Sequence, residues 1–171
     1  MIETSYQSSP IMVVETPKAV PFVLANAFTS DPFGGNPAAI VFLDSDLSSE
    51  TLLNISKNFN QPMTTFILPS DVQDTENLSR SYRVRWFTTV TEVVICGHGT
   101  LAAAGVIFAL AKVPSSVQVL NFVAKNGAKL TSRKVDNRVE ITLPSTLVQP
   151  LPSDEEARWN QLCEEQMGRR H

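Results

Sequence analysis

The chain has 171 residues, 43% of them hydrophobic, which is enough for one domain with a hydrophobic core. Its formal net charge of −3 argues against the basic surface that nucleic-acid-binding proteins carry, so we expect no nucleic-acid partner. Two cysteines are too few for a disulfide framework, and the sequence shows neither a membrane-spanning apolar run nor a signal peptide, so we expect a cytoplasmic protein without membrane contact.

The first part of the chain is predicted to contain a polar arm followed by a strand-rich lobe. Residues 1–19 are rich in Ser, Thr and Pro, and the lobe is predicted to cover residues 20–150. It opens with a strand over Pro21–Phe28, where β-branched and aromatic residues gather. Glycines and prolines predict a turn over Asp31–Pro37. The apolar run Ala38–Leu43 predicts a strand that is buried on both faces.

A helix and two further strands are predicted next. Ser48 is a good N-cap for a helix that ends near Asn58. Thr64–Leu68 is predicted to be a strand, and the polar segment Ser70–Leu78 an exposed loop. Ser81–Thr88 alternates as a strand does. This alternation places Tyr82, Val84 and Trp86 on one face and Arg83, Arg85 and Phe87 on the other.

The longest helix is predicted over Gly97–Val113, and it has no polar face. A helix that is apolar all round is a buried one. In a domain of this size, burial on every side predicts a sheet that wraps round the helix.

The remainder of the lobe is predicted to be a set of hairpins. Strands are expected over Gln118–Ala124, Ala128–Lys134 and Arg138–Leu143. Asn126–Gly127 and Asp136–Asn137 have the composition of tight hairpin turns. The last segment, residues 151–171, is predicted to form a polar C-terminal helix with acidic residues in its first turn.

The strongest chemical signal is the segment Val94–Ala102, where a strand is predicted to lead through a glycine-flanked turn into the apolar helix. A helix N-terminus offers free N–H groups to a carboxylate and is expected to lower the pKa of the Cys96 thiol. His98 titrates near neutrality when unperturbed. This combination favours abstraction of a proton next to a carboxylate.

A simpler interpretation of the same residues stays open. A lone buried cysteine is usually a small hydrophobic residue, and a lone histidine often has a structural role. Glu92, four residues before Cys96, is a candidate to orient the turn.

These motifs resemble one known family. Arg85–Thr88 and Glu92–Ala104 are similar to conserved segments of the PhzF-like (phenazine biosynthesis-like) family, whose fold is shared with diaminopimelate epimerase and proline racemase. Asn26–Thr29 and Pro32–Ala39 resemble two further segments of that family. The resemblance spans about residues 21–145, in order and at matching spacing.

The resemblance implies an α+β fold consisting of a single lobe, in which a mixed or antiparallel sheet is curled round a buried central helix at about residues 97–113. It implies no cofactor, and the sequence has no metal-ligand spacing. The expected catalytic residues are His98 and Cys96. The residues expected to bind substrate are Gly97, Gly99, Thr100, Asn36, Gly35, Met63 and Thr64.

The chain departs from the family pattern in two respects. Met63 stands where the family has its acid/base glutamate, and methionine can neither take nor give a proton. Family members are also nearly twice as long and have a second lobe. A homodimer of single lobes could replace that second lobe, because the two lobes are related by pseudo-two-fold symmetry.

Three functions are consistent with these features. The first is a cofactor-independent isomerase or racemase-like enzyme that acts on a small organic acid or secondary-metabolite intermediate by proton transfer, with a site completed in a homodimer. The second is a cyclase that shapes its substrate in an apolar cleft. The third is a non-catalytic remnant that binds a small molecule or a partner.

Overall fold

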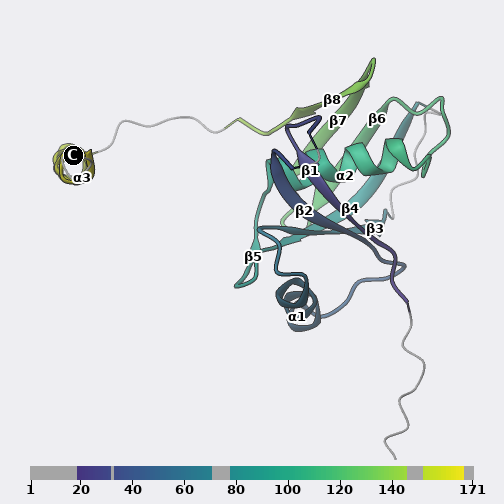
Figure 1. Ribbon diagram of the computed structural model, residues 1–171, viewed down its shortest axis with the longest axis horizontal. Helices are drawn as coiled ribbons and strands as arrows, with labels where there is room; N and C mark the ends of the chain where they lie inside the picture. The colour runs from purple at the N-terminus through teal and green to yellow at the C-terminus, as the bar shows by residue number, and fades with distance from the viewer. Residues whose placement is uncertain (1–18, 32, 71–77, 146–151, 168–171) are drawn as a thin grey trace, which may run out of the picture.

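A computed structural model describes residues 19–31, 33–70, 78–145 and 152–167. A curled sheet encloses one helix and carries a second helix on its outer side (Figure 1). The strands are β1 (Phe22–Ala27), β2 (Asn36–Phe42), β3 (Thr64–Pro69), β4 (Ser79–Phe87), β5 (Glu92–Val93), β6 (Val119–Ala124), β7 (Lys129–Val135) and β8 (Arg138–Thr142). The helices are α1 (Ser49–Phe59), α2 (Gly97–Ala109) and α3 (Ser153–Met167).

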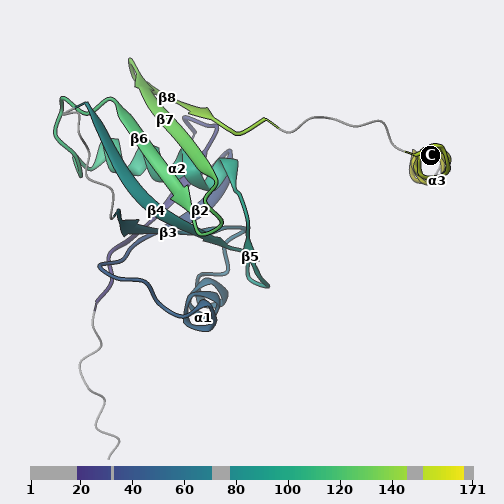
Figure 2. The ribbon, with the colours of Figure 1, turned by 180° about the vertical axis from the view of Figure 1, so that it is seen from behind.

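The sheet is mixed, in the order β1-β2-β3-β4-β6-β7-β8, with β5 paired to β4. β2–β3 and β4–β6 are the parallel pairs, and the remaining pairs are antiparallel. Parallel neighbours need a crossover connection, and each of these two crossovers contains a helix. α1 crosses on the outer side of the sheet and α2 on the inner side, as both views show (Figures 1 and 2).

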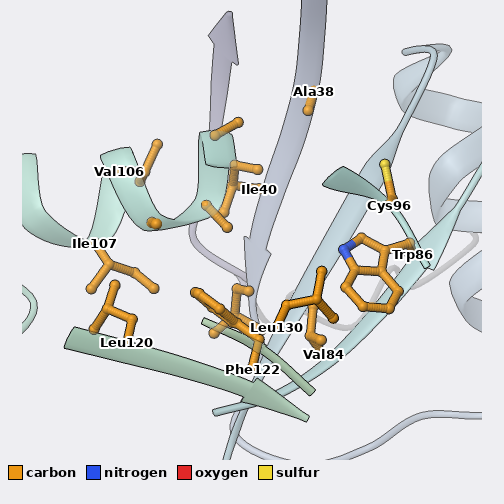
Figure 3. Packing of buried hydrophobic residues seen from close by; sticks show 14 of the residues in the cluster. Ala38, Ile40, Val84, Trp86, Cys96, Val106, Ile107, Leu120, Phe122 and Leu130 are labelled. Carbon is orange, nitrogen blue, oxygen red and sulfur yellow. The ribbon is translucent and has the colours of Figure 1, made fainter. Parts of the chain in front are cut away.

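The inner position of α2 confirms the predicted wrapping. β1 and β8, at opposite ends of the sheet, both contact α2. Figure 3 shows Ile107 of α2 facing Leu120 of β6, and both residues belong to one core cluster. Because α2 has apolar residues on nearly every side, only a curled sheet can cover most of its surface at once.

The coverage of α2 is nevertheless incomplete, which differs from the expectation of burial on every side. Leu101, Gly105 and Ala109 line a groove that lies between β1 and β8. The sheet is a half-barrel with an open seam, because its two edge strands do not pair with each other.

The alternation predicted for β4 is confirmed. Val84 and Trp86 belong to the core around α2, whereas Phe87 belongs to the second core beneath α1. β2 is buried on both faces as predicted, because α1 and α2 cover its opposite sides. No helix within the described ranges is long and apolar enough to cross a membrane.

Three local expectations need correction or lie outside the structure. The strand expected to lead directly to Cys96 ends at Val93. Of the expected polar loop, residues 71–77 lie outside the described residues, as do residues 1–18 of the predicted arm. The expected C-terminal helix is present as α3.

α2 ends at Ala109 and not at Val113 as predicted. Ala111 has a left-handed φ of 49°, and the N–H groups of Ala111 and Lys112 donate to the carbonyls of Phe108 and Ile107. These two bonds form a Schellman motif, which usually has glycine at the left-handed position. The sequence signal was missed because alanine occupies that position here.

We therefore expect Ala111→Gly to raise the free energy of unfolding by about 0.5–1 kcal/mol, since relief of the left-handed penalty outweighs the extra entropy of the unfolded chain. Ala109→Gly, in the last helical position, is the matched control and should lower the free energy of unfolding by about the same amount. Urea denaturation measures both. Equal destabilisation by the two substitutions would contradict the assignment of the helix end.

Candidate active site

The site is formed where the chain enters α2. Cys96 is the N-cap in an extended conformation, and its Sγ accepts a hydrogen bond from the Gly99 N–H at 3.4 Å. The Thr100 hydroxyl donates to the Cys96 carbonyl at 2.7 Å. These bonds fix the thiol at the start of the helix, where the unpaired N–H groups of the first turn gather.

Cys96 and His98 are in direct contact. Their Sγ and Nδ1 atoms are 3.3 Å apart, and either atom can be the donor, depending on the tautomer of the imidazole. The second ring nitrogen, Nε2, is buried and has no hydrogen-bond partner of normal geometry among the described residues. The thiol and the imidazole that the sequence singled out thus lie in contact at the start of α2.

Burial keeps both groups in their neutral forms. It raises the pKa of the Cys96 thiol, and the backbone N–H groups of Gly99 and His98 only partly oppose this effect. Burial also lowers the pKa of His98, against a smaller opposing effect of the Pro37 carbonyl. The expectation that the helix N-terminus lowers the thiol pKa is therefore wrong, because desolvation of the thiolate outweighs the helix.

The floor of the site comes from the start of β3. A Cβ placed on Gly99 would lie 2.6 Å from the Thr65 hydroxyl and 3.1 Å from Cγ of Met63. Only glycine allows this close approach of α2 to β3. Met63 therefore lies against the first turn of α2, where the sequence comparison with the family had placed a glutamate.

Sequence reasoning missed Thr65 and Leu143 as neighbours of the site. A Cβ on Gly97 would lie 3.5 Å from the Leu143 side chain, which follows β8. Thr65 could have been found from strand alternation, because it shares a face with Met63. No local signal in the sequence connects Leu143 to α2.

Three expected binding residues have other positions. The Thr64 side chain alternates with Met63 and Thr65, so it points toward the α1 side and is not brought to the site. Gly35 has a φ of 79°, and a Cβ there would lie 2.2 Å from the Ala27 carbonyl, which gives this glycine a structural role. Asn36 opens β2 beside Pro37, whose carbonyl faces His98.

An ion-pair cluster around the buried Arg85 anchors the segment before Cys96. Arg85, with a side chain only 5% exposed, binds both carboxylate oxygens of Glu92 at 2.7 Å. It also donates to Asp46 and to the Leu47 carbonyl, both at 2.9 Å, and to the Ser49 hydroxyl. The Arg85 guanidinium lowers the pKa of Glu92, so Glu92 orients the turn as an ion-pair partner and is not a base.

No group of three His, Cys, Asp or Glu side chains within the described ranges is arranged to hold a metal ion. Both cysteines are free, and Cys163 lies on α3.

Comparison with known proteins agrees with this architecture. The family model described as phenazine biosynthesis-like protein matches residues 25–168. A phenazine biosynthesis-like domain-containing protein of Bos taurus is 37% identical over 125 residues, which are 73% of this chain and 42% of that protein. A Pseudomonas aeruginosa protein named as an uncharacterised isomerase is 37% identical over 124 residues, which cover 72% of this chain and 43% of that protein.

A solved structure agrees as well. The PhzF-family phenazine biosynthesis protein of Enterococcus faecalis has a TM-score of 0.60 and 30% identity, and the match covers 81% of this chain and 50% of that one. The half-barrel curled round a helix therefore corresponds to about half of a protein of this class. The chain belongs to the phenazine biosynthesis-like family, and it spans less than half the length of the curated relatives named here.

The Arg85 cluster predicts that substituting Arg85 lowers the free energy of unfolding far more than substituting an exposed arginine does. Arg85→Leu should lower the free energy of unfolding by about 3 kcal/mol, because it leaves carboxylates without their buried partner. The exposed pair Arg133–Glu140 is the control, and Arg133→Leu should cost less than about 1 kcal/mol. Denaturant unfolding at pH 7 measures both, and similar losses for the two variants would contradict the anchoring role.

The environment of His98 predicts that the stability of the fold depends on pH. The folded pKa lies below the ordinary value of 6.5, so the folded state binds fewer protons than the unfolded state. Stability should therefore decrease as the pH falls through 6.5 and level off below the folded pKa. NMR titration of the histidine ring protons measures the pKa of His98 directly. The variant His98→Gln assigns the His98 resonance, because that resonance disappears. The same variant should lose less stability at low pH than the wild-type chain. A measured pKa at or above 6.5 would contradict burial of the imidazole.

Proposed function

We propose that this chain is a cofactor-independent isomerase or racemase-like enzyme that moves a proton on a small organic acid or a secondary-metabolite intermediate. The observation that carries this proposal is the contact between Cys96 Sγ and His98 Nδ1 at the first turn of α2. The isomerase name of the Pseudomonas aeruginosa relative supports the same reaction class.

The neutral state of the pair suits proton transfer in either direction. With the Nδ1 proton directed at sulfur, Nε2 has a free lone pair and His98 can accept a proton from carbon. With the thiol proton directed at Nδ1, His98 can donate its Nε2 proton while Nδ1 takes the proton of Cys96, which leaves a thiolate and a neutral imidazole. Negative charge that develops on a substrate carboxylate would be stabilised by the N–H groups of the α2 first turn. Because Nε2 is covered in the free chain, substrate binding must uncover it.

The proposed site includes a second copy of the chain. Val94, Ile95 and Leu143 are large apolar side chains exposed next to the α2 N-terminus. A copy related by a two-fold axis would cover them and bring a second Cys96–His98 pair to the same cleft.

A second candidate is a cyclase that positions a reactive chain against an apolar wall. It is favoured by Met63, which is buried beside Gly99 and cannot exchange protons. Positioning alone can lower a barrier by several kcal/mol. This candidate predicts that turnover survives loss of both Cys96 and His98.

Proton transfer is tested by deuterium incorporation from D2O into a panel of chiral 2-amino, 2-hydroxy and unsaturated small acids, followed by NMR. We expect His98→Gln to reduce the rate by about 10²-fold or more, with Cys96→Ser also slowed, because general acid–base groups contribute at this level. Arg133→Leu, remote from the site, should leave the rate unchanged. No incorporation into any compound, or full activity in His98→Gln, would overturn the isomerase proposal, and turnover without exchange in Cys96→Ser/His98→Gln would favour the cyclase.

A further inference from the structure

α3 presents an apolar stripe to solvent. Trp159, Leu162 and Cys163 have the spacing i, i+3, i+4, which places them on one face of the helix. Trp159 is 55% exposed, and Leu162 is exposed as well. Among the described residues, no element pair in extensive contact includes α3. A helix of this length is marginal in water by itself, so its stability depends on a surface that covers this stripe.

The lobe has an open groove of suitable shape. The seam between β1 and β8 has a volume of about 810 Å³ and exposes one side of α2. Its floor is formed by Leu101, Gly105 and Ala109, which are four residues apart and therefore lie along one stripe. A Cβ placed on Gly105 would meet nothing within 4 Å, so a bulky side chain from another helix can approach the α2 backbone closely there.

The rim of the groove and α3 are complementary in character. Phe28 is 70% exposed at the rim and has a left-handed φ of 64°, a strained conformation for an aromatic residue. Among the described residues that line the groove, Arg138 is the one that carries a charge. α3 carries five acidic residues and one arginine within Ser153–Met167. The groove therefore offers apolar surface and positive charge to a helix with an apolar stripe and an acidic remainder.

We propose that α3 of a second copy docks its Trp159–Leu162–Cys163 stripe into this groove, and that the exchange is reciprocal. Reciprocal exchange gives a closed two-fold dimer with two identical helix-in-groove contacts. A second copy is favoured over the chain's own lobe because Trp159 and Leu162 stay exposed in the single chain, and no element pair in extensive contact within the described residues includes α3. The inference rests on the second copy of the proposed function and is independent of the proton-transfer chemistry.

The first test fills the groove. Gly105→Leu should leave the lobe folded, because leucine is a better helix former than glycine and the space at that position is open. The double variant Gly105→Leu/Trp159→Ala should raise the dissociation constant of the dimer at least tenfold, because the groove is filled and the aromatic anchor is lost. Asn160→Ala on another face of α3 is the matched control. Sedimentation equilibrium measures the dissociation constant.

Tryptophan fluorescence gives a second readout of docking. Trp86 is buried in the core, so a blue shift of emission that grows with protein concentration would report burial of Trp159. This shift should be absent in Gly105→Leu, and Trp159→Phe should lack it as well.

Disulfide crosslinking distinguishes exchange from docking within one chain. Under a mild added oxidant, a Gly105→Cys/Cys163→Ser chain mixed with wild-type chain should form a covalent dimer through the wild-type Cys163. A Gly105→Cys chain alone should form the same dimer species. An intramolecular disulfide of monomer mass would overturn the exchange.

The outcomes separate this inference from the proposed function. A dimer that Gly105→Leu and Trp159→Ala leave intact would overturn α3 docking and leave the second copy at the site standing. A chain that stays monomeric at all concentrations would overturn the second copy both at the Cys96–His98 site and in the groove. Deuterium incorporation by that monomer would still support proton transfer.

Discussion

Burial of α2 is the constraint on which the rest of the structure depends. Because the helix is apolar on nearly every side, packing against one flat layer would leave much of it in water. The sheet therefore curls until β1 and β8, its two edges, both touch the helix. The two helical crossovers follow from the same arrangement, with α2 inside the curl and α1 closing the outer face of β2–β4.

The chemistry at the α2 N-terminus is a consequence of this burial. Cys96 caps a helix that lies inside a sheet, so the thiol is shielded from water and its pKa is raised in spite of the helix N-terminus. The same shielding keeps His98 neutral. Gly99 allows the helix to press against Thr65 and Met63, which determines what forms the floor of the site. The contact between this neutral thiol and neutral imidazole is the basis of the proposed proton transfer.

The incomplete curl has its own consequence. The sheet reaches α2 from both edges and leaves a seam along Leu101, Gly105 and Ala109. The seam and the exposed Trp159 of α3 each have apolar surface that the other could cover, which is the basis of the proposed docking. On the opposite side of the sheet, Arg85 binds Glu92 and so connects the outer layer to the turn that carries Cys96.

The sequence by itself determined the wrapping of the helix and the two faces of β4, because hydrophobic periodicity acts locally. It also singled out Cys96 and His98, whose contact only the structure shows. Tertiary structure decided the sign of the Cys96 pKa shift, since desolvation depends on residues brought together from β3 and α2. It also brought Leu143 to Gly97 and turned Thr64 away from the site. The end of α2 at Ala109 depended on a left-handed alanine, which has no composition signal because glycine usually occupies that position.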